Sequence, residues 1–408
     1  MSRFGFGTYR ISDMNPSQIE ALREAIQGGV TIIDTSTNYL DGAAERAIGL
    51  ALAGLDDKIV QNIEIISKVG YIQGSNLREY HKAPFEGVVK YSQECYYSIE
   101  PDFIHDQLSE SLKRLDRKKI SCYLLHNPEY YLLDAINRGV DRDERLDDLY
   151  SKIYKAFVAL ENEVAQGRID SYGISSNSFS LKHGDEAFLP YEDLITLAQR
   201  ASTDVGNEKQ SFSTIQLPVN LLEQEGLKCA KWAKRNGLRV IANRPLNAIY
   251  EGGMVRLAEY DESNYYYNYL NELLEICDNE PLRALYNLIE ELDASKHRFS
   301  WIGEYETFLV SAVMPHIKNS LMKIANDEVD MLLHSIELFL QEYRNMVAYE
   351  CGIKSAALVK KLGLGCNRRL QECALNFLLE QNDIDCILVG MRRSSYVSEI
   401  LAFEEEIA

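Results

Sequence analysis

Four residues suited to proton transfer follow short apolar runs in the first third of the chain. They are Asp34 after VTII, Tyr39 five residues later, Lys68 after IIS and His126 after YLL. A tyrosine phenol is a weak acid with a pKa of about 10, but a neighbouring lysine cation favours the phenolate and lowers that pKa. A carboxylate keeps the lysine charged, and a histidine orients a carbonyl oxygen by donating a hydrogen bond. The four residues therefore predict delivery of a proton to a carbonyl group during its reduction.

Each of these residues also has a purely structural explanation. A buried aspartate–lysine pair is often structural, and a histidine at the end of a strand is often a core residue. The presence of all four after successive apolar runs favours catalysis. Other chemistries fit less well, because the sequence shows no metal-ligand spacing and hence no predicted metal site. A glycosidase would also need two facing carboxylates, which these run ends lack.

Eight short apolar runs must position these side chains. Segments with helical spacing separate the runs, and this alternation indicates an α/β fold with a parallel sheet. Eight such units predict a (β/α)8 TIM barrel, whose active site lies at the carboxyl ends of the strands. An open doubly wound sheet is the alternative, but it usually carries G-x-G-x-x-G after its first strand, which FGFGTYRIS does not supply. The runs are RFGFGTY, VTIID, IEIISKVG, ISCYLLH, DSYGIS, STIQLP, LRVIANRP and IDCILVG.

The alternation stops in residues 251–362, which contain long helical patterns and no convincing strand. In EVDMLLHSIELFLQEYRNMVAY the apolar residues fall three or four apart, as on one face of a helix. We predict a large α-helical insertion after strand 7. Residues 1–250 then hold barrel strands 1–7, residues 251–362 form an insertion over the barrel mouth, and residues 363–408 hold the last helices and strand 8. An oligomer contact or a simple decoration is an equally weighted role for the insertion.

Composition limits the partners. The 408 residues carry 43 basic and 62 acidic side chains, for a net charge of −19. This acidic balance argues against nucleic acid and anionic membranes as partners. We find no secretory signal and no apolar run long enough to span a membrane, and the eight cysteines contain no C-x-x-C pair. We therefore expect a cytoplasmic protein with reduced thiols, and leave its oligomeric state open.

The motifs as a set resemble the aldo-keto reductase family. GVTIIDTSTNYLDGAAERAIG is similar to the family's first signature, IISKVG to its lysine motif and YLLHNPE to its histidine motif. GRIDSYGISSNSF, IQLPVNLLE and LVGMRRSSYVSEILA resemble its cofactor-binding segments. The resemblance covers residues 3–247 and 366–403. The VGM of the last segment, and Y-L-D-G in place of Y-G, lean toward the branch that contains L-galactose and related sugar dehydrogenases.

The resemblance implies a barrel oxidoreductase that uses NAD(P). It would interconvert a carbonyl (an aldehyde, ketone or sugar hemiacetal) with an alcohol or lactone. Tyr39 would be the general acid or base, Asp34 and Lys68 would tune it, and His126 would orient the carbonyl. The substrate would be a small carbonyl compound or sugar. The residues implied in cofactor binding are Ser175, Ser176, Asn177, Gln216, Arg244, Leu246, Gly390, Arg392, Arg393 and Ser394.

Two arginines favour NADP over NAD as the cofactor. Arg392 and Arg393 follow the last strand, where the resemblance places the adenosine ribose, and arginine matches a 2′-phosphate with a charge-assisted fork. Ser394 adds a hydroxyl donor. The alternative is that the arginines face solvent or pair with Glu399, in which case NAD remains open.

The sequence departs from the family at three places. Ser176 stands where the family has an amide, and Asn177 follows one place late. Asn243 replaces an aromatic residue that commonly stacks on the nicotinamide, and the N-terminal hairpin below the barrel is missing. An alternative function is a cofactor-binding, non-catalytic or regulatory barrel that resembles potassium-channel β subunits and uses the insertion as a partner surface. The intact set of four proton-transfer residues favours the enzyme.

Overall fold

The computed structural model describes residues 2–322 and 326–407, which divide into two compact units. The barrel unit comprises Met1–Val219, Glu223–Pro245 and Leu378–Ala408. The helical unit comprises Asn220–Leu222 and Leu246–Phe377. Each unit is described by itself below.

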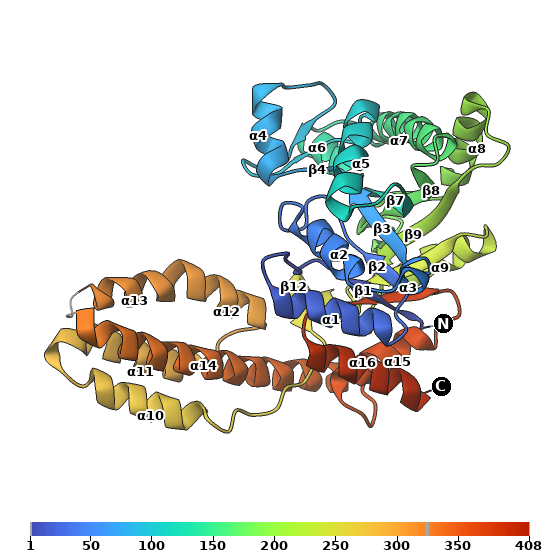
Figure 1. Cartoon of the computed structure of the whole chain (residues 1–408). Coiled ribbons are helices and arrows are strands. Elements are labelled where there is room, and N and C mark those ends of the chain that lie inside the picture. The colour runs from blue at the N-terminus through green and yellow to red at the C-terminus, as the bar shows by residue number, and fades with distance from the viewer. Residues whose placement is uncertain (1, 323–325, 408) are drawn as a thin grey trace. The chain divides into compact units, whose positions relative to one another are not determined.

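Eight parallel strands close into a barrel in the order β1-β13-β10-β9-β8-β7-β3-β2, which confirms the predicted (β/α)8 fold and excludes the open sheet. The strands are almost continuously buried, because helices cover their outer faces (Figure 1). All eight apolar runs supply a strand. The strands are β1 (Phe4–Gly7), β2 (Ile32–Asp34), β3 (Glu64–Val69), β7 (Ile120–His126), β8 (Ile169–Ser175), β9 (Phe212–Pro218), β10 (Arg239–Asn243) and β13 (Cys386–Val389).

The surrounding helices begin and end at residues that suit helix termini. The side chain of Asn15 caps the first helix by accepting from the backbone N–H of Gln18, and Pro16 occupies its first position. Pro101 opens α5 in the same way. The helices of this unit are α1 (Pro16–Gln27), α2 (Ala43–Ala53), α3 (Asp57–Val60), α4 (Gly74–Lys82), α5 (Pro101–Leu115), α6 (Tyr130–Asn137), α7 (Arg142–Ala165), η1 (Ser178–Ser180), α8 (Leu194–Val205), α9 (Gly226–Arg235) and α16 (Ser394–Ile407).

A small antiparallel sheet lies between β3 and α5 in the chain. Its strands are β4 (Tyr71–Ile72), β5 (Val89–Lys90) and β6 (Tyr96–Tyr97), in the order β4-β6-β5. Tyr97 is fully buried and its ring stacks on Tyr130 at a centroid distance of 5.2 Å. This aromatic packing holds the excursion after β3 against the start of α6.

The helical unit has its own hydrophobic core, built largely on one long helix, α14. The apolar positions that predict this helix face inward: Leu332, Ile336, Phe339, Tyr343 and Met346 are each at most 4% exposed. Helices α10 and α12 both pack on α14. The elements are β11 (Asn247–Tyr250), β12 (Gly253–Arg256), α10 (Tyr266–Cys277), η2 (Glu280–Leu282), α11 (Arg283–Ser295), α12 (Ile302–Phe308), the π-helix η3 (Leu309–Val313), α13 (Met314–Leu321), α14 (Asn326–Lys361) and α15 (Leu370–Leu379).

Two expectations about these segments are wrong. Residues 251–362 do contain a strand, because β12 pairs with β11 in a hairpin around Glu251 and Gly252, which both have positive φ. The thiols are not all reduced, because Cys366 and Cys373 form a disulfide with a Cα–Cα distance of 5.8 Å. The entry of the chain into α15 turns Cys373 back toward the preceding loop. The other six cysteines are free.

None of the helices within residues 2–322 and 326–407 combines the length and the hydropathy needed to cross a lipid bilayer.

Candidate active site

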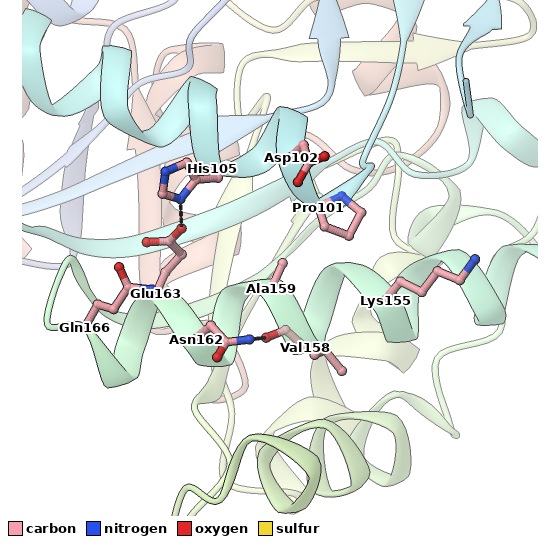
Figure 2. Close-up of a pocket in the computed structure, with 9 residues that line it drawn as sticks. All are labelled: Pro101, Asp102, His105, Lys155, Val158, Ala159, Asn162, Glu163 and Gln166. Carbon is pink, nitrogen blue, oxygen red and sulfur yellow. Dashed lines mark hydrogen bonds and ion pairs between the residues drawn. The ribbon is translucent and has the colours of Figure 1, made fainter. Parts of the chain in front are cut away.

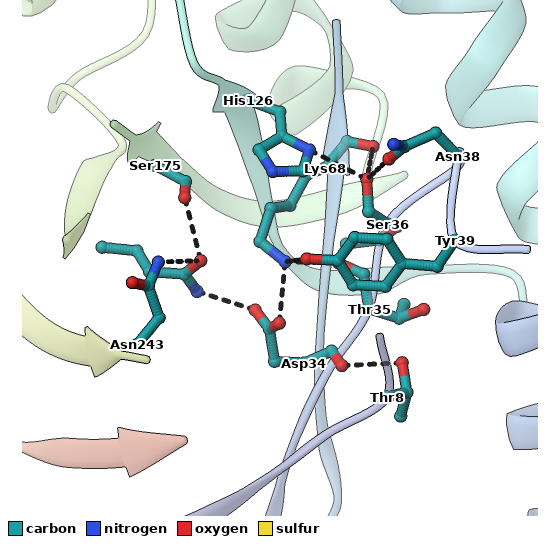
Figure 3. A network of polar contacts seen from close by, with 12 residues as sticks. Thr8, Asp34, Thr35, Ser36, Asn38, Tyr39, Lys68, His126, Ser175 and Asn243 are labelled. Carbon is teal, nitrogen blue, oxygen red and sulfur yellow. Dashed lines mark hydrogen bonds and ion pairs between the residues drawn. The ribbon is translucent and has the colours of Figure 1, made fainter. Parts of the chain in front are cut away.

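Neighbouring barrel strands bring polar side chains together at their carboxyl ends (Figure 3). In the strand register, Ser175 pairs with His126 on one side and with Gln216 on the other, so these three residues form one layer. The two strands on the other side of β7 supply a lysine and an aspartate. The polar residues in strand order are Asp34 (β2), Lys68 (β3), His126 (β7), Ser175 (β8), Gln216 (β9) and Asn243 (β10).

Lys68 is the centre of this arrangement. Its side chain is fully buried, and its Nζ donates to Asp34 Oδ2 at 2.7 Å and to the Thr35 carbonyl at 2.7 Å. The third donor position points to the Tyr39 hydroxyl at 3.2 Å. The Lys68 ammonium therefore donates to one carboxylate, one carbonyl and one phenol. This is the arrangement predicted for a tyrosine acid whose pKa is set by a neighbouring lysine.

Gln216 and Ser175 extend the network from the other face of Asp34. Gln216 Nε2 donates to Asp34 Oδ1 at 2.7 Å, and its Oε1 accepts from Ser175 Oγ at 2.9 Å. Asn243 Nδ2 reaches the same Oε1 at 3.4 Å. Both oxygens of Asp34 are therefore engaged, which fixes the carboxylate beside Lys68.

A tight turn places Tyr39. The three residues that follow it have left-handed backbone, with φ of 48° at Leu40, 55° at Asp41 and 79° at Gly42. The Asp41 carboxylate accepts from the backbone N–H and the hydroxyl of Ser75, at 3.0 and 2.6 Å, and so ties the turn to α4. Left-handed backbone is costly outside glycine, so this tether supports the conformation that points the phenol toward Lys68.

The pKa values at the site reflect two opposing effects, burial and the charges of neighbouring groups. Burial alone would lower the pKa of Lys68, but the Asp34 carboxylate and Tyr39 raise it above its ordinary value. Burial raises the pKa of Tyr39, and the opposing influence of Lys68 is the smaller effect. The sequence suggested a lowered phenol pKa. The structure instead keeps the phenol protonated at neutral pH, with its proton available for donation.

His126 is uncharged in this setting. Burial lowers the pKa of its imidazole well below the ordinary value, and the Lys68 cation lowers it further. Its ring lies 6.0 Å from that of Tyr39 and 4.8 Å from that of Tyr71, in both cases edge to face. A neutral imidazole carries one N–H, so it suits the donation of a single hydrogen bond to a carbonyl.

The loop after β8 is bound by a carboxylate that sequence reasoning missed. Ser176 Oγ donates to Glu129 Oε2 at 2.8 Å, and the Asn177 backbone N–H donates to Glu129 Oε1 at 2.9 Å. The hydroxyl of Ser176 is therefore turned to Glu129, whereas Asn177 is exposed. Burial raises the pKa of Glu129 to about 7.

The remaining predicted cofactor residues lie after β10 and β13. Arg244 has a φ of 52° and forms an ion pair with Glu223 at 2.7 Å. Leu246 belongs to the helical unit. Gly390 is the first residue after β13, and Ser394 is the first residue of α16.

The two arginines of this loop differ in exposure. Arg392 is half-buried, whereas Arg393 is exposed and its guanidinium lies 5.7 Å from the ring centroid of Tyr396.

Sequence reasoning also missed the residues that support the predicted four. Thr8 after β1 donates its hydroxyl to the Asp34 carbonyl at 2.9 Å. Ser36 Oγ lies 3.1 Å from His126 Nδ1. Thr8 could have been found as the residue directly after a strand, and Ser36 as a close neighbour of Asp34 in the same loop.

A shallow pocket of about 260 Å³ lies elsewhere, between α5 and α7 on the outside of the barrel. His105 Nδ1 and Glu163 Oε1 are 2.7 Å apart there (Figure 2). None of the predicted site residues lines it. The predicted site residues therefore lie at the strand ends and not in this pocket.

Comparison with known proteins gives the same family as the motifs. A sequence profile of the Aldo/keto reductase family matches residues 3–406. Methylglyoxal reductase YeaE of Escherichia coli (strain K12) is 26% identical over 180 residues, 43% of this chain and 46% of that protein. Aflatoxin B1 aldehyde reductase member 2 of Homo sapiens is 28% identical over 118 residues, 28% of this chain and 26% of that protein. The chain thus matches less than half the length of these curated relatives.

A solved structure gives the same fold. The aldo-keto reductase AKR11C1 from Bacillus halodurans (holo form) is 15% identical, covers 99% of this chain and 87% of its own, and has a TM-score of 0.50. Because the family profile matches nearly the whole sequence, this chain belongs to the aldo/keto reductase family.

Proposed function

We propose that this chain is an NADP-dependent oxidoreductase that interconverts a carbonyl group and an alcohol, with Tyr39 as the general acid or base. One observation carries the proposal. Tyr39, Lys68 and Asp34 form a continuous chain of contacts, with 3.2 Å from phenol to ammonium and 2.7 Å from ammonium to carboxylate, and His126 lies beside the phenol. These are the groups needed to hand a proton to a carbonyl oxygen.

The roles of the three ionisable groups follow from their contacts. In reduction, the protonated Tyr39 gives its proton to the carbonyl oxygen. The buried ammonium of Lys68 stabilises the phenolate that is left, because opposite charges attract strongly in a low-dielectric site. Asp34 keeps Lys68 charged, and the neutral His126 donates a hydrogen bond to the same carbonyl oxygen.

The residues present fit a nicotinamide dinucleotide. Asn243 Oδ1 is buried and has no hydrogen-bond partner among the described residues, so it can accept from a carboxamide. Near Gly390 no described heavy atom lies within 4 Å of where a side chain would begin, and the N-terminus of α16, which suits an anion, starts four residues later. NADP would supply or accept the hydride when bound. Ser175 and Gln216 would hold its nicotinamide end, and Arg392, Arg393 and Ser394 its adenosine phosphate end.

The substrate we propose is a small carbonyl compound. Both curated relatives are named for carbonyl compounds, methylglyoxal and aflatoxin B1 aldehyde. A continuous series of edge-to-face ring contacts of 4.7 to 6.0 Å runs through Tyr39 and His126, which suits a substrate with an apolar or ring-shaped body. The rings of this series are those of Tyr91, Tyr130, Tyr71, His126, Tyr39 and Tyr9.

Cytoplasmic location is part of the same proposal. It rests on the six free cysteines, which suit a reducing compartment. The Cys366–Cys373 disulfide is the feature that speaks against it.

The decisive experiment is Tyr39→Phe, which removes only the hydroxyl. We expect carbonyl reduction by the full chain with NADPH to fall by roughly 10² or more, the usual contribution of a general acid, while the Kd for NADPH changes little. Tyr154→Phe is the matched control, because Tyr154 lies on α7 and its hydroxyl contacts Asp204 of α8, away from the strand ends. A Tyr39→Phe variant with most of its activity would refute the role of Tyr39. Binding of NADPH without turnover of any carbonyl by the wild type would favour the regulatory barrel.

A further inference from the structure

The proposed role of His126 requires its proton to be on one particular nitrogen. A neutral imidazole has one N–H and one lone pair, and the nitrogen that faces the carbonyl must carry the proton. Among the described residues, Ser36 Oγ is the hydrogen-bonding partner of Nδ1, at 3.1 Å. Nε2 is therefore the nitrogen left for the substrate, and the state of Nδ1 decides what Nε2 can do.

Ser36 has one hydroxyl proton and several acceptors around it. Its Oγ lies 2.7 Å from Asn38 Oδ1, 3.1 Å from His126 Nδ1 and 3.3 Å from the Lys68 carbonyl. If the proton goes to Asn38, Nδ1 must carry the ring proton and donate to Ser36, which leaves Nε2 as a lone pair. If the proton goes to Nδ1, then Nε2 carries the ring proton and can donate to a carbonyl.

Ser36 belongs to a longer chain of hydrogen bonds whose direction can reverse. Figure 3 shows Ser36 between Asn38 and His126. Asn38 Nδ2 lies 3.1 Å from Gln73 Oε1. An amide places its oxygen and its NH2 group at equivalent positions, so turning both amides by 180° keeps every contact and reverses every donor. In that direction Gln73 donates to Asn38, Asn38 donates to Ser36, and Ser36 donates to His126.

The burial of Ser36 suits this direction. Ser36 is completely buried, which keeps water from competing for its proton. Each hydrogen bond from Gln73 to His126 Nδ1 then has one donor and one acceptor.

We propose that the Ser36–Asn38–Gln73 chain fixes the tautomer of His126, with Ser36 donating to Nδ1 so that Nε2–H is presented to the substrate carbonyl. These three residues are positioning residues, because they act through His126. The inference rests on the proposed function through the role given to His126.

The tautomer can be measured without any substrate. In the full chain labelled with 15N at histidine, the shifts of the two ring nitrogens show which one is protonated, and His126→Asn identifies the signals. We expect an Nε2–H tautomer in the wild type and in Ser36→Thr, which keeps a hydroxyl. Ser36→Ala should lose that preference. Asn38→Asp should impose Nδ1–H, because a carboxylate can only accept from Ser36.

Thr37→Val is the matched control for these spectra. It removes a buried hydroxyl that has no hydrogen-bond partner among the described residues, one position along the same loop. Its His126 signals should match those of the wild type. An Nδ1–H tautomer in the wild type, or an unchanged tautomer in Ser36→Ala, would overturn the proposal.

Kinetics supply the second measurement. We expect kcat to fall roughly tenfold or more in Ser36→Ala and Asn38→Asp, with the Kd for NADPH unchanged and with recovery in Ser36→Thr. A normal kcat in Ser36→Ala, despite a changed tautomer, would show that the Ser36–Asn38–Gln73 hydrogen bonds do not contribute to catalysis. If the wild type reduces no carbonyl but its tautomer responds as expected, the proposed function fails while the control of the tautomer by Ser36 stands.

Discussion

At the scale of single residues, burial decides whether Tyr39 and His126 are charged, and it outweighs the effect of the neighbouring ammonium on the tyrosine. Tyr39 contacts an ammonium and yet keeps a raised pKa, and the His126 pKa falls because the same ammonium adds to burial. Both groups are thereby ready to donate hydrogen to a carbonyl oxygen. Reading the residue types alone gives the right partners but the wrong net direction for the tyrosine.

Glu129 gives the clearest pH dependence. Its pKa in the folded state is about 7, above its ordinary value of 4.5, because it is buried. A carboxyl group with a raised folded-state pKa contributes stability that is fully present below about pH 4.5 and is lost as the pH rises through about 7. The ionised side chain then costs on the order of 3 kcal/mol above pH 7.

We therefore predict that Glu129→Gln becomes more stable relative to the wild type as the pH rises from 5 to 8. Glutamine keeps an oxygen for the Asn177 N–H and never ionises. The measurement is the free energy of unfolding in urea at both pH values. If the stability difference between Glu129→Gln and the wild type does not vary with pH, this would contradict the raised pKa of Glu129.

Three of the four predicted proton-transfer residues share one property, their place at a strand end. Asp34, Lys68 and His126 follow apolar runs, so the barrel topology alone brings them together. Asn38 and Gln73 could not be predicted, because they meet through two loops whose paths depend on tertiary contacts such as that of Asp41 with Ser75. Glu129 is easier to find from the sequence, since it lies three residues after His126.

At the scale of elements, the start of α16 and the loop before it carry the choice of cofactor. Arg392, Arg393 and Ser394 lead into a helix whose first N–H groups face an anion favourably. Arg393 is exposed and near Tyr396, and it forms no salt bridge with any residue that the structure describes, so none of those has to break before it binds a phosphate. This arrangement suits a 2′-phosphate on the adenosine ribose.

We predict that Arg392→Ala and Arg393→Ala each weaken NADP binding at least roughly tenfold, as expected for a charge-assisted contact of about 1.5–3 kcal/mol. NAD binding should change little, because NAD lacks the phosphate. The Kd values for both cofactors, measured by fluorescence titration, provide the test. Equal losses for NAD and NADP, or no loss for either, would remove the basis for NADP.

Among the elements of the insertion, the long helix was predictable and the hairpin was not. The 3.6-residue repeat from Leu332 to Met346 is long enough to be distinct, whereas β11 and β12 have four residues each and pair only with one another. We predict that Phe339→Ala destabilises the helical unit by about 3–5 kcal/mol, because Phe339 is 1% exposed in the core of that unit.

The control for that prediction is Met331→Ala on the same helix, where Met331 is 74% exposed. It should change stability by less than about 0.5 kcal/mol. Urea unfolding followed by circular dichroism, with carbonyl reduction measured in parallel, separates the helical unit from the barrel. Loss of barrel stability equal to that of the helical unit would show that the two unfold as one.

At the scale of the whole molecule, a helical unit with its own hydrophobic core is inserted into the sequence of the barrel. Seven barrel strands before residue 245 (β1, β2, β3, β7, β8, β9 and β10) and the single strand β13 belong to the same closed sheet, while the intervening helices bury their own apolar residues. A unit with its own core can be altered without removing the barrel's core. Its purpose can therefore be tested separately from the chemistry.

The last prediction concerns the purpose of residues 251–362, which we propose to cover the substrate mouth. The insertion leaves the barrel after β10, and loops that follow barrel strands at their carboxyl ends shape the substrate site. Replacing these residues with a short Gly/Ser loop should therefore raise KM for the carbonyl substrate more than it lowers barrel stability. The Kd for NADPH serves as the check that the barrel still binds cofactor. Phe339→Ala offers a milder perturbation and should shift KM in the same direction. An unchanged KM, in a replaced protein that still binds NADPH, would assign the insertion to an oligomer or partner contact instead.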